Sequence, residues 1–242
     1  MILERESISK KFEGKNMGQS PLISIILPAL NEEKAIHKVI SEIPLHKLPP
    51  TEILVVDGCS QDNTINIAKE CGAKVITEYK KGYGQAIYTG LKHAKGDIIV
   101  WMDSDYTYPS HQIPELVQPI LDNKADIVLG SRIKGKIHPG AMTILHRFGN
   151  LYLTMLFNIF FFKNLSDTQT GFRAFSKHAL KLLKMSNNGM GFATQTLTQA
   201  VKKRLKIKEI EIVYRPRIGC SKLHSFKDGV RILIEIIKGI FK

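Results

Sequence analysis

The sequence predicts an α/β protein with a Rossmann-like, mostly parallel sheet flanked by helices, and three observations support this fold class. Short apolar runs alternate with segments of helical periodicity through the first half of the chain. The runs are apolar on both faces, as strands are when helices cover both sides of a parallel sheet. Polar clusters follow several runs, where ligands bind in such sheets. The length of 242 residues suits one large domain with an appendage.

Strands are expected wherever a short apolar run of the first half ends in a turn: Leu22–Leu27, Glu52–Val56, Lys74–Thr77, Asp97–Met102 and Asp126–Leu129. Asn31, followed by Glu32 and Glu33, is typical of a helix N-cap with acids in the first turn. We therefore expect the first helix to begin at Asn31. Asp62 is expected to cap the next helix, which covers Thr64–Glu70.

The second half is richer in helices. We expect helices over Met142–Phe162, Lys177–Lys184, Ala193–Lys203 and Lys227–Lys242, with strands at Phe172–Phe175 and Lys206–Tyr214. The chain divides into a flexible N-terminal segment (1–20), a main domain (21–225) and a C-terminal amphipathic helix (226–242). No apolar run reaches the roughly 18 residues of a membrane span, so we expect no segment to cross a bilayer.

Charge is distributed unevenly along the chain. Residues 1–126 contain 14 Lys/Arg and 17 Asp/Glu, a net charge of −3, whereas residues 127–242 contain 21 and 5, a net charge of +16. This imbalance favours an anionic partner, which is a nucleic acid, an acidic membrane surface or a phosphorylated substrate. Background basicity that aids solubility is the plainer alternative. The basic half lacks a nucleic-acid motif with interleaved aromatic residues, so no nucleic-acid partner is expected.

The cysteines give no sign of a disulfide scaffold or a structural zinc site. Cys59, Cys71 and Cys220 are widely spaced and form no C-x-x-C pair. The sequence therefore favours a reducing, cytoplasmic setting.

Two carboxylates, Asp103 and Asp105, follow the fourth apolar run. At the end of a buried strand they repel each other unless a cation bridges them. Hard oxygen ligands of this kind suit Mg²⁺ or Mn²⁺, with diphosphate oxygens completing the coordination shell. The sequence therefore predicts a divalent metal site here.

For each of the other polar residues at the expected strand ends, the sequence allows two interpretations, one structural and one functional. Asp57 and Glu32 are either local turn and helix-start residues or hydrogen-bond partners for a nucleobase or ribose. Gly82 and Gly84 lie at a helix start, where backbone N–H groups bind a diphosphate, although a simple turn has the same pattern.

A dense cationic loop follows the last expected strand. Arginine offers paired donors that match phosphate oxygens, and Pro216 and Gly219 restrict the loop backbone. We expect phosphate binding by this loop, and Arg132 and Arg147 are further candidates; the loop residues are Arg215, Arg217, Ser221 and Lys222.

Several motifs occur together in a fixed order: PALNE (Pro28–Glu32), VVDGCSQDNT (Val55–Thr64), the G-x-G helix start, DSD (Asp103–Asp105), GSR (Gly130–Arg132), DTQTGFRAF (Asp167–Phe175) and YRPRIGCSKL (Tyr214–Leu223). In combination they resemble the family 2 glycosyltransferases with the GT-A fold, over about residues 21 to 230. Within this family the chain is most similar to the polyprenyl-phosphate or dolichyl-phosphate hexose synthases, such as dolichol-phosphate mannose synthase.

The resemblance implies an inverting, metal-dependent transfer of a hexose from a nucleotide sugar (GDP-mannose, UDP-glucose or UDP-N-acetylglucosamine) to a lipid phosphate. It implies a nucleoside pocket lined by Pro28, Ala29, Glu32 and Asp57. It places Mg²⁺ or Mn²⁺ on Asp103 and Asp105. It surrounds the donor and acceptor phosphates with Arg132, Arg147, Arg215, Arg217, Ser221 and Lys222. Within this set, the residues expected to act in catalysis are Asp105, Arg132 and Arg217.

The sequence departs from the family pattern at two positions. Thr107 stands where the family often has a glutamine as a further metal ligand, and Gln195 stands where relatives often have an acid. Many relatives also carry transmembrane helices after the catalytic domain. Because this chain ends at Lys242, we expect it to associate peripherally with the cytoplasmic membrane face.

The acceptor is expected to be a phosphate. A hydroxyl acceptor loses a proton as it attacks, so it usually needs a carboxylate base. A lipid monophosphate, with a second pKa of about 6, is already anionic near neutral pH. Between Ile127 and Lys208 the only carboxylate is Asp167, which acts either as a base or as a structural residue that orients Arg173 or caps the loop. A soluble or sugar-hydroxyl acceptor and a nucleotidyltransferase are the alternatives.

Two apolar segments are candidates for contact with an anionic membrane: the Leu151–Phe162 window and one face of Lys227–Lys242. Core packing or a homo-oligomer contact is the alternative for both.

Overall fold

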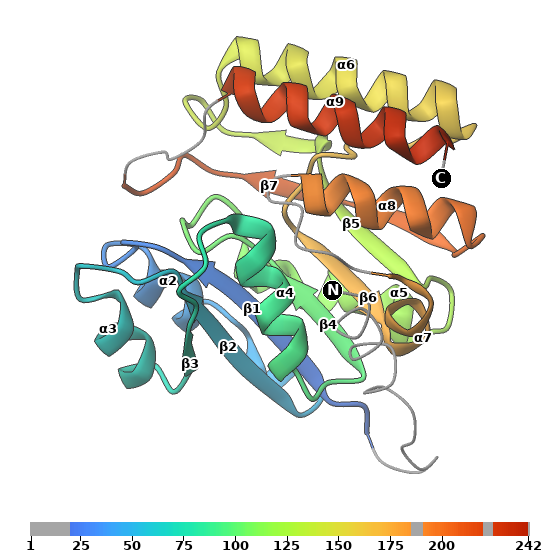
Figure 1. Ribbon diagram of the computed structural model, residues 1–242. Coiled ribbons are helices and arrows are strands. Elements are labelled where there is room, and N and C mark those ends of the chain that lie inside the picture. Colours follow the sequence, from blue (N-terminus) through green and yellow to red (C-terminus); the bar gives the residue numbers. More distant parts are fainter. Residues whose placement is uncertain (1–19, 185–190, 220–224, 242) are drawn as a thin grey trace.

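The computed structural model describes residues 20–184, 191–219 and 225–241, and these form a seven-stranded sheet with helices on both faces (Figure 1). The strand order is β3-β2-β1-β4-β6-β5-β7. The strands are β1 (Ile23–Ala29), β2 (Thr51–Asp57), β3 (Lys74–Thr77), β4 (Ile98–Trp101), β5 (Ile127–Ile137), β6 (Arg173–Ser176) and β7 (Ile207–Tyr214). All paired strands run parallel except β6, which is antiparallel to both β4 and β5. The expected mostly parallel α/β sheet is confirmed.

The α-helices are α2 (Ile36–Ser41), α3 (Thr64–Glu70), α4 (Tyr83–His93), α5 (Ile113–Leu121), α6 (Ile144–Phe161), α7 (Lys177–Leu182), α8 (Phe192–Lys202) and α9 (Ser225–Phe241). Two short 3₁₀ turns, η1 (Leu45–Lys47) and η2 (Ser110–Gln112), complete the described elements. The expected flexible segment at residues 1–20 lies almost wholly outside the described residues.

The sheet separates two apolar cores. Because side chains alternate along a strand, Ile26 of β1 faces one core while Ile25 and Leu27 face the other. One core packs the sheet against α4, α6, α8 and α9, and the other packs it against α2, α3 and α5. This sandwich leaves the ends of the strands free to carry polar side chains.

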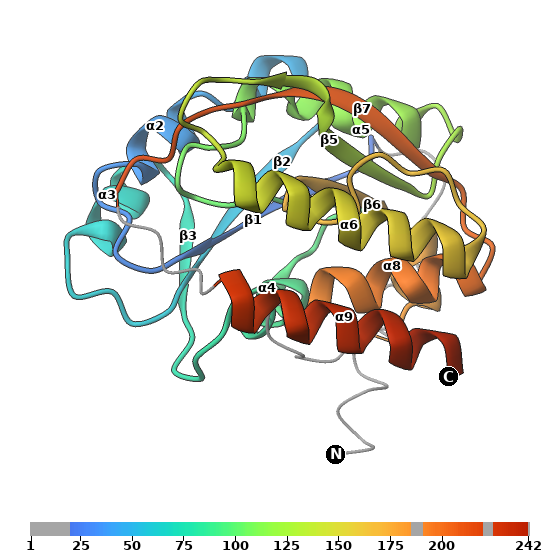
Figure 2. The same cartoon turned by 90° about the horizontal axis from the view of Figure 1, so that it is seen from above.

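The helices α6 and α9 lie side by side as an outer layer, which both views show (Figure 2). Within α6, Leu153, Phe157 and Phe161 are buried in the core. The opposite side of the same helix is exposed, and α9 is likewise exposed at Val230, Ile234, Ile237 and Ile240. Among the described residues, no helix has the length and apolar content needed to cross a bilayer.

The first helix does not begin at Asn31, and that prediction is wrong. Helix α2 starts at Ile36, and Asn31 adopts a left-handed backbone conformation with a φ of 49°. Its side chain accepts a hydrogen bond from the backbone N–H of Gln61 instead, at 2.8 Å. Asp62, by contrast, accepts from the backbone N–H of Thr64 at the start of α3, as expected.

Candidate active site

The carboxyl ends of β1, β2 and β4 meet at one edge of the sheet. Ala29, the last residue of β1, pairs with Asp57, the last residue of β2. The loop after β4 joins them because the Ser104 hydroxyl donates to the backbone oxygen of Pro28 at 2.7 Å. Parallel pairing therefore brings together three segments that the sequence motifs had singled out separately.

Asp103 lies in the loop after β4, where there is little free space around its carboxylate. Its Oδ1 is buried and accepts no hydrogen bond of standard geometry among the described residues, although the Tyr83 hydroxyl lies close enough to the carboxylate to favour its charged form. A Cβ added to Gly171 would lie 2.9 Å from its Oδ2, so only glycine leaves room for the carboxylate. Burial and the neighbouring Asp105 carboxylate raise the pKa of Asp103 to about 7. A half-buried carboxylate with one buried oxygen beside a second carboxylate is suited to a cation.

Both oxygens of the Asp105 carboxylate accept hydrogen bonds. Its Oδ1 accepts from the backbone N–H and the hydroxyl of Thr107, at 3.0 and 2.5 Å. Its Oδ2 accepts from Nη1 of Arg217 at 2.7 Å. Thr107 therefore fixes the orientation of Asp105.

Arg217 also reaches the end of β1. Its Nη2 donates to Oε1 of Glu32, which is only 7% exposed. One guanidinium thus joins Asp105, the expected metal ligand, to Glu32, the expected ribose ligand. The Nε of the same guanidinium is buried without a hydrogen-bond partner among the described residues.

The side chain of Asp57 is fully buried and forms hydrogen bonds within its own loop. Its Oδ2 accepts from the backbone N–H of Ser60 at 2.9 Å, and its Oδ1 accepts from the Ser60 hydroxyl at 2.5 Å. The structure therefore displays the turn-forming role of Asp57, and a contact to a nucleobase stays a prediction.

Arg132, on β5, forms a buried ion pair with Asp167. Its Nε and Nη2 donate to the two carboxylate oxygens at 2.7 and 2.8 Å, and its guanidinium lies 5.3 Å from the ring centre of Tyr214. Asp167 thus orients Arg132, and the prediction that it orients Arg173 is wrong. Arg173 instead donates to backbone oxygens, including that of Thr168 at 2.7 Å.

Arg215 lies apart from the carboxylates of the strand ends. Its guanidinium donates to both carboxylate oxygens of Glu42, at 2.9 and 2.8 Å, and stacks 4.6 Å from the ring centre of Tyr106. Arg147 is exposed in the first turn of α6. Ser221 and Lys222 lie outside the described residues.

The glycine-rich turn supplies one residue that the sequence argument missed. Gly82 precedes α4 with a φ of 131°, a conformation open mainly to glycine, and Gly84 is buried in the first turn. Between them, Tyr83 is partly buried with its hydroxyl inside the protein, and burial together with the carboxylate of Asp103 raises its pKa. Hydrogen bonding between this hydroxyl and the Asp103 carboxylate contributes to the same shift in pKa. The G-x-G motif itself was the signal, since its middle residue faces the acidic cluster.

The donor set fits a divalent metal. Asp103 and Asp105 offer hard oxygen ligands, and beyond the nearby Tyr83 hydroxyl no described group satisfies the buried Oδ1 of Asp103. Among the described residues, no cluster of three or more Asp, Glu, His or Cys side chains forms a complete cage. Two carboxylates of this kind would suit a Mg²⁺ or Mn²⁺ ion that is also bound by substrate phosphates.

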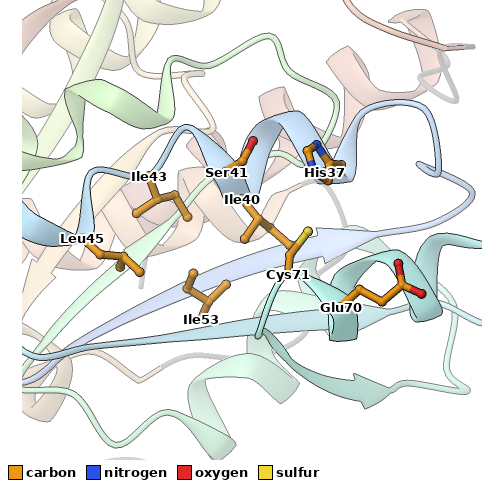
Figure 3. Close-up of a pocket in the computed structure, with 8 residues that line it drawn as sticks. All are labelled: His37, Ile40, Ser41, Ile43, Leu45, Ile53, Glu70 and Cys71. Carbon is orange, nitrogen blue, oxygen red and sulfur yellow. The ribbon is translucent and has the colours of Figure 1, made fainter.

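A separate apolar pocket of about 410 Å³ lies between α2, α3 and β2 (Figure 3). Its lining includes His37, Ile40, Ile53 and Cys71. None of the expected site residues lines it, so it is distinct from the site at the strand ends.

Comparison with known proteins identifies the class. The family model described as glycosyl transferase family 2 matches residues 24–183. The chain therefore belongs to glycosyl transferase family 2, which confirms the resemblance deduced from the motifs. It is a glycosyltransferase.

Three curated relatives come from archaea. A low-salt glycan biosynthesis hexosyltransferase of Haloferax volcanii is 39% identical over 88% of this chain, which spans 52% of that relative's length. A UDP-N-acetylglucosamine–dolichyl-phosphate N-acetylglucosaminyltransferase of Methanococcus voltae is 34% identical, with 88% of this chain and 95% of the relative covered. A dolichyl-phosphate hexose transferase of Haloferax volcanii is 32% identical, with 89% and 92% covered.

Solved structures share the fold. Glucosyl-3-phosphoglycerate synthase of Mycobacterium tuberculosis, crystallised with Mn²⁺, UDP-glucose and phosphoglyceric acid, matches 100% of this chain and 84% of its own. The TM-score is 0.73 and the identity 23%. The same enzyme with Mg²⁺ and UDP gives a TM-score of 0.73 at 22% identity. This similarity confirms the GT-A architecture.

Proposed function

We propose that this glycosyltransferase moves a hexose or N-acetylhexosamine from a nucleotide sugar to the phosphate of a polyprenyl or dolichyl phosphate. The observation that carries the proposal is the state of Asp167. Both of its carboxylate oxygens accept hydrogen bonds from Arg132, so the basic half presents a cation where a hydroxyl acceptor would require a base. The curated relatives named for dolichyl-phosphate acceptors support the same choice.

The chemistry then needs no proton transfer. An oxygen of the acceptor phosphate forms a bond to C1 of the sugar while the bond from C1 to the donor diphosphate breaks. The electron pair leaves with the nucleoside diphosphate, and attack from the opposite side inverts the configuration at C1. Near neutral pH the acceptor monoester already carries its negative charge, since its second pKa is about 6.

Mg²⁺ or Mn²⁺, held by Asp103 and Asp105, would neutralise the diphosphate leaving group. Arg132 is fixed by Asp167 and by the ring of Tyr214, so it offers a cation of constant position. A fixed cation steers an anionic acceptor and orients it for in-line attack, and both effects lower the barrier. Arg147 and Arg215 are secondary candidates for the same task.

The donor side belongs to the ends of β1 and β2. Pro28, Ala29, Glu32 and Asp57 lie there together, which suits a nucleoside. The relative from Methanococcus voltae is named for UDP-N-acetylglucosamine, and this favours that donor over GDP-mannose and UDP-glucose.

A lipid acceptor also explains the apolar face of α6 and α9. Ile144, Phe148 and Phe162 are 76%, 67% and 92% exposed, which is unusual for large apolar side chains in water. We place this face, together with the positive charge of the second half, on an anionic membrane surface at the cytoplasmic side.

The experiment is a donor screen followed by product analysis. Each of the three nucleotide sugars is tested with Mn²⁺ by thermal shift, where a ligand at 100 times its Kd adds about 2.7 kcal/mol of stability. The donor that stabilises is incubated with polyprenyl phosphate. The proposal expects a sugar-1-phosphate lipid of inverted anomeric configuration. Transfer to phosphoglyceric acid with none to the lipid phosphate would contradict it.

A further inference from the structure

Arg217 occupies the two carboxylates that a donor needs. Its Nη1 lies 2.7 Å from Oδ2 of Asp105, and its Nη2 donates to Glu32. Both oxygens of Asp105 accept hydrogen bonds in this state, whereas Oδ1 of Asp103 accepts none of standard geometry among the described residues. A metal that binds Asp103 and Asp105 together therefore competes with the guanidinium for the negative charge of Asp105.

Arg217 and Arg132 differ in exposure and in how their guanidinium groups are hydrogen-bonded. The side chain of Arg132 is 7% exposed and donates two hydrogen bonds to one fully buried carboxylate. The side chain of Arg217 is 23% exposed, divides its donors between two carboxylates and leaves Nε buried without a partner among the described residues. An unsatisfied donor lowers the stability of this arrangement, so Arg217 is the more easily exchanged of the two.

The backbone around Arg217 is anchored independently of its side chain. The N–H of Ile218 donates to the backbone oxygen of Asp105 at 3.1 Å, and the N–H of Arg215 donates to that of Thr107 at 3.0 Å. The Arg215 side chain adds two hydrogen bonds to the carboxylate of Glu42. Rotation of one side chain is therefore enough to release the carboxylates.

We propose that Arg217 is an internal counterion, which neutralises Asp105 and Glu32 in the free enzyme and transfers to the donor diphosphate when metal and nucleotide bind together. The inference rests on the proposed metal role of the two aspartates. It makes Arg217 a substrate-binding residue that couples the binding of metal to the binding of nucleotide.

Charge explains why the two ligands bind together. A metal ion that arrives alone displaces the guanidinium and leaves two cations close to each other, which is unfavourable at short range. A nucleoside diphosphate removes this repulsion because its phosphate oxygens provide a new partner for the released guanidinium. By linkage, the metal strengthens nucleotide binding by the same factor as the nucleotide strengthens metal binding.

The test is a titration with Mn²⁺, read from the electron paramagnetic resonance of the free ion, on Arg217→Gln and the unaltered protein. Each is titrated alone and with UDP or GDP. We expect Arg217→Gln to bind Mn²⁺ without nucleotide roughly tenfold or more tightly than the unaltered protein, since no charge-assisted hydrogen bond has to be broken. The enhancement by nucleotide should shrink in the variant.

Lys38→Gln is the matched control for net charge. Lys38 is exposed and lies 5.8 Å from the ring centre of Tyr106, which is in the same loop as Asp105. Within the described residues, Asp105 and Glu32 form their ion pairs with Arg217 and not with Lys38. We expect its Mn²⁺ affinity to stay close to that of the unaltered protein. If Arg217→Gln does not fold, Arg217→Lys replaces it, because a single ammonium cannot fork to both carboxylates and should give a smaller gain in affinity.

Each outcome separates the two proposals. Mn²⁺ affinity of the Arg217 variant that equals or falls below that of the unaltered protein would overturn the counterion role alone. An absence of Mn²⁺ binding by every protein, with and without nucleotide, would overturn the metal site itself. Tighter Mn²⁺ binding by the variant, combined with no transfer to lipid phosphate by the unaltered protein, would support the counterion role and remove only the proposed acceptor.

Discussion

The two halves of the chain bring opposite charges to one site. Residues 1–126 carry a net charge of −3 and provide carboxylates at the ends of β1, β2 and β4. Residues 127–242 carry +16 and provide Arg132 from β5 and Arg217 from the segment after β7. The proposed function divides the work in the same way: the first half would bind a cation with the donor, and the second half would bind an anionic acceptor.

The strongest test of the acidic side is Asp105→Asn. The substitution removes a metal-ligand charge from the leaving-group side, and activity should fall on the order of a thousandfold, or about 4 kcal/mol of barrier. Asp122→Asn is the control, because Asp122 pairs with Lys124 on the surface and should leave turnover unchanged. The measurement is the steady-state rate with and without EDTA. Near-normal turnover in EDTA would contradict the assignment of Asp105 as a metal ligand.

The basic side is tested by breaking its buried ion pair. Arg132→Met strands the fully buried carboxylate of Asp167, so we expect the free energy of unfolding to fall by about 3 kcal/mol. The double variant Arg132→Met/Asp167→Leu removes both charges and should recover most of that loss while transfer stays low. Denaturant unfolding measures both effects. A single variant as stable as the unaltered protein would show that the pair is not desolvated in solution.

A smaller effect is expected where the second half touches the acidic side. The Cβ of Gly171→Ala would lie 2.9 Å from Oδ2 of Asp103, and relieving such an overlap costs about 1–3 kcal/mol. Mn²⁺ affinity in the presence of nucleotide should fall by about tenfold or more. Gly149→Ala, with no atom within 4 Å of the added Cβ, serves as the control. Equal losses from both substitutions would mean that Gly171 has no special relation to Asp103.

The smallest effect concerns the outer layer. Phe148→Asp should weaken binding to anionic vesicles by about 1.5 kcal/mol, and added salt should weaken it further. Tyr79→Asp is the control, since Tyr79 is 82% exposed on the connection between β3 and α4. Co-sedimentation with vesicles measures the affinities. Identical binding to neutral and acidic vesicles would contradict the electrostatic part, and dimerisation through α6 and α9 without vesicle binding would reassign the face to a second copy.

Local pattern was enough to predict the parallel strands and the acidic loop after β4. The position of β6 was not predictable in the same way, because its antiparallel pairing with β4 and β5 depends on contacts between segments distant in sequence. Asn31 shows why a local signal fails. Asparagine is a common N-cap residue, yet here the Asn31 side chain accepts a tertiary hydrogen bond from Gln61 and does not cap a helix.

The candidate site shows the same limit. Composition identified the arginines as cations for phosphate but gave no information about which carboxylate each would pair with. Arg132 finds Asp167 within the second half, whereas Arg217 crosses to Asp105 and Glu32 in the first half. These partners are set by how β5 and β7 pack beside each other, and the sequence pattern does not encode that packing.

The division between the halves is tested most directly by comparing two acceptors under one donor. Polyprenyl phosphate and the corresponding free polyprenol are assayed side by side with the same labelled nucleotide sugar, Mn²⁺ and vesicles. A base-poor, cationic acceptor side predicts transfer to the phosphate and essentially none to the alcohol. Comparable rates on the alcohol would contradict both the acceptor assignment and the mechanism without a base.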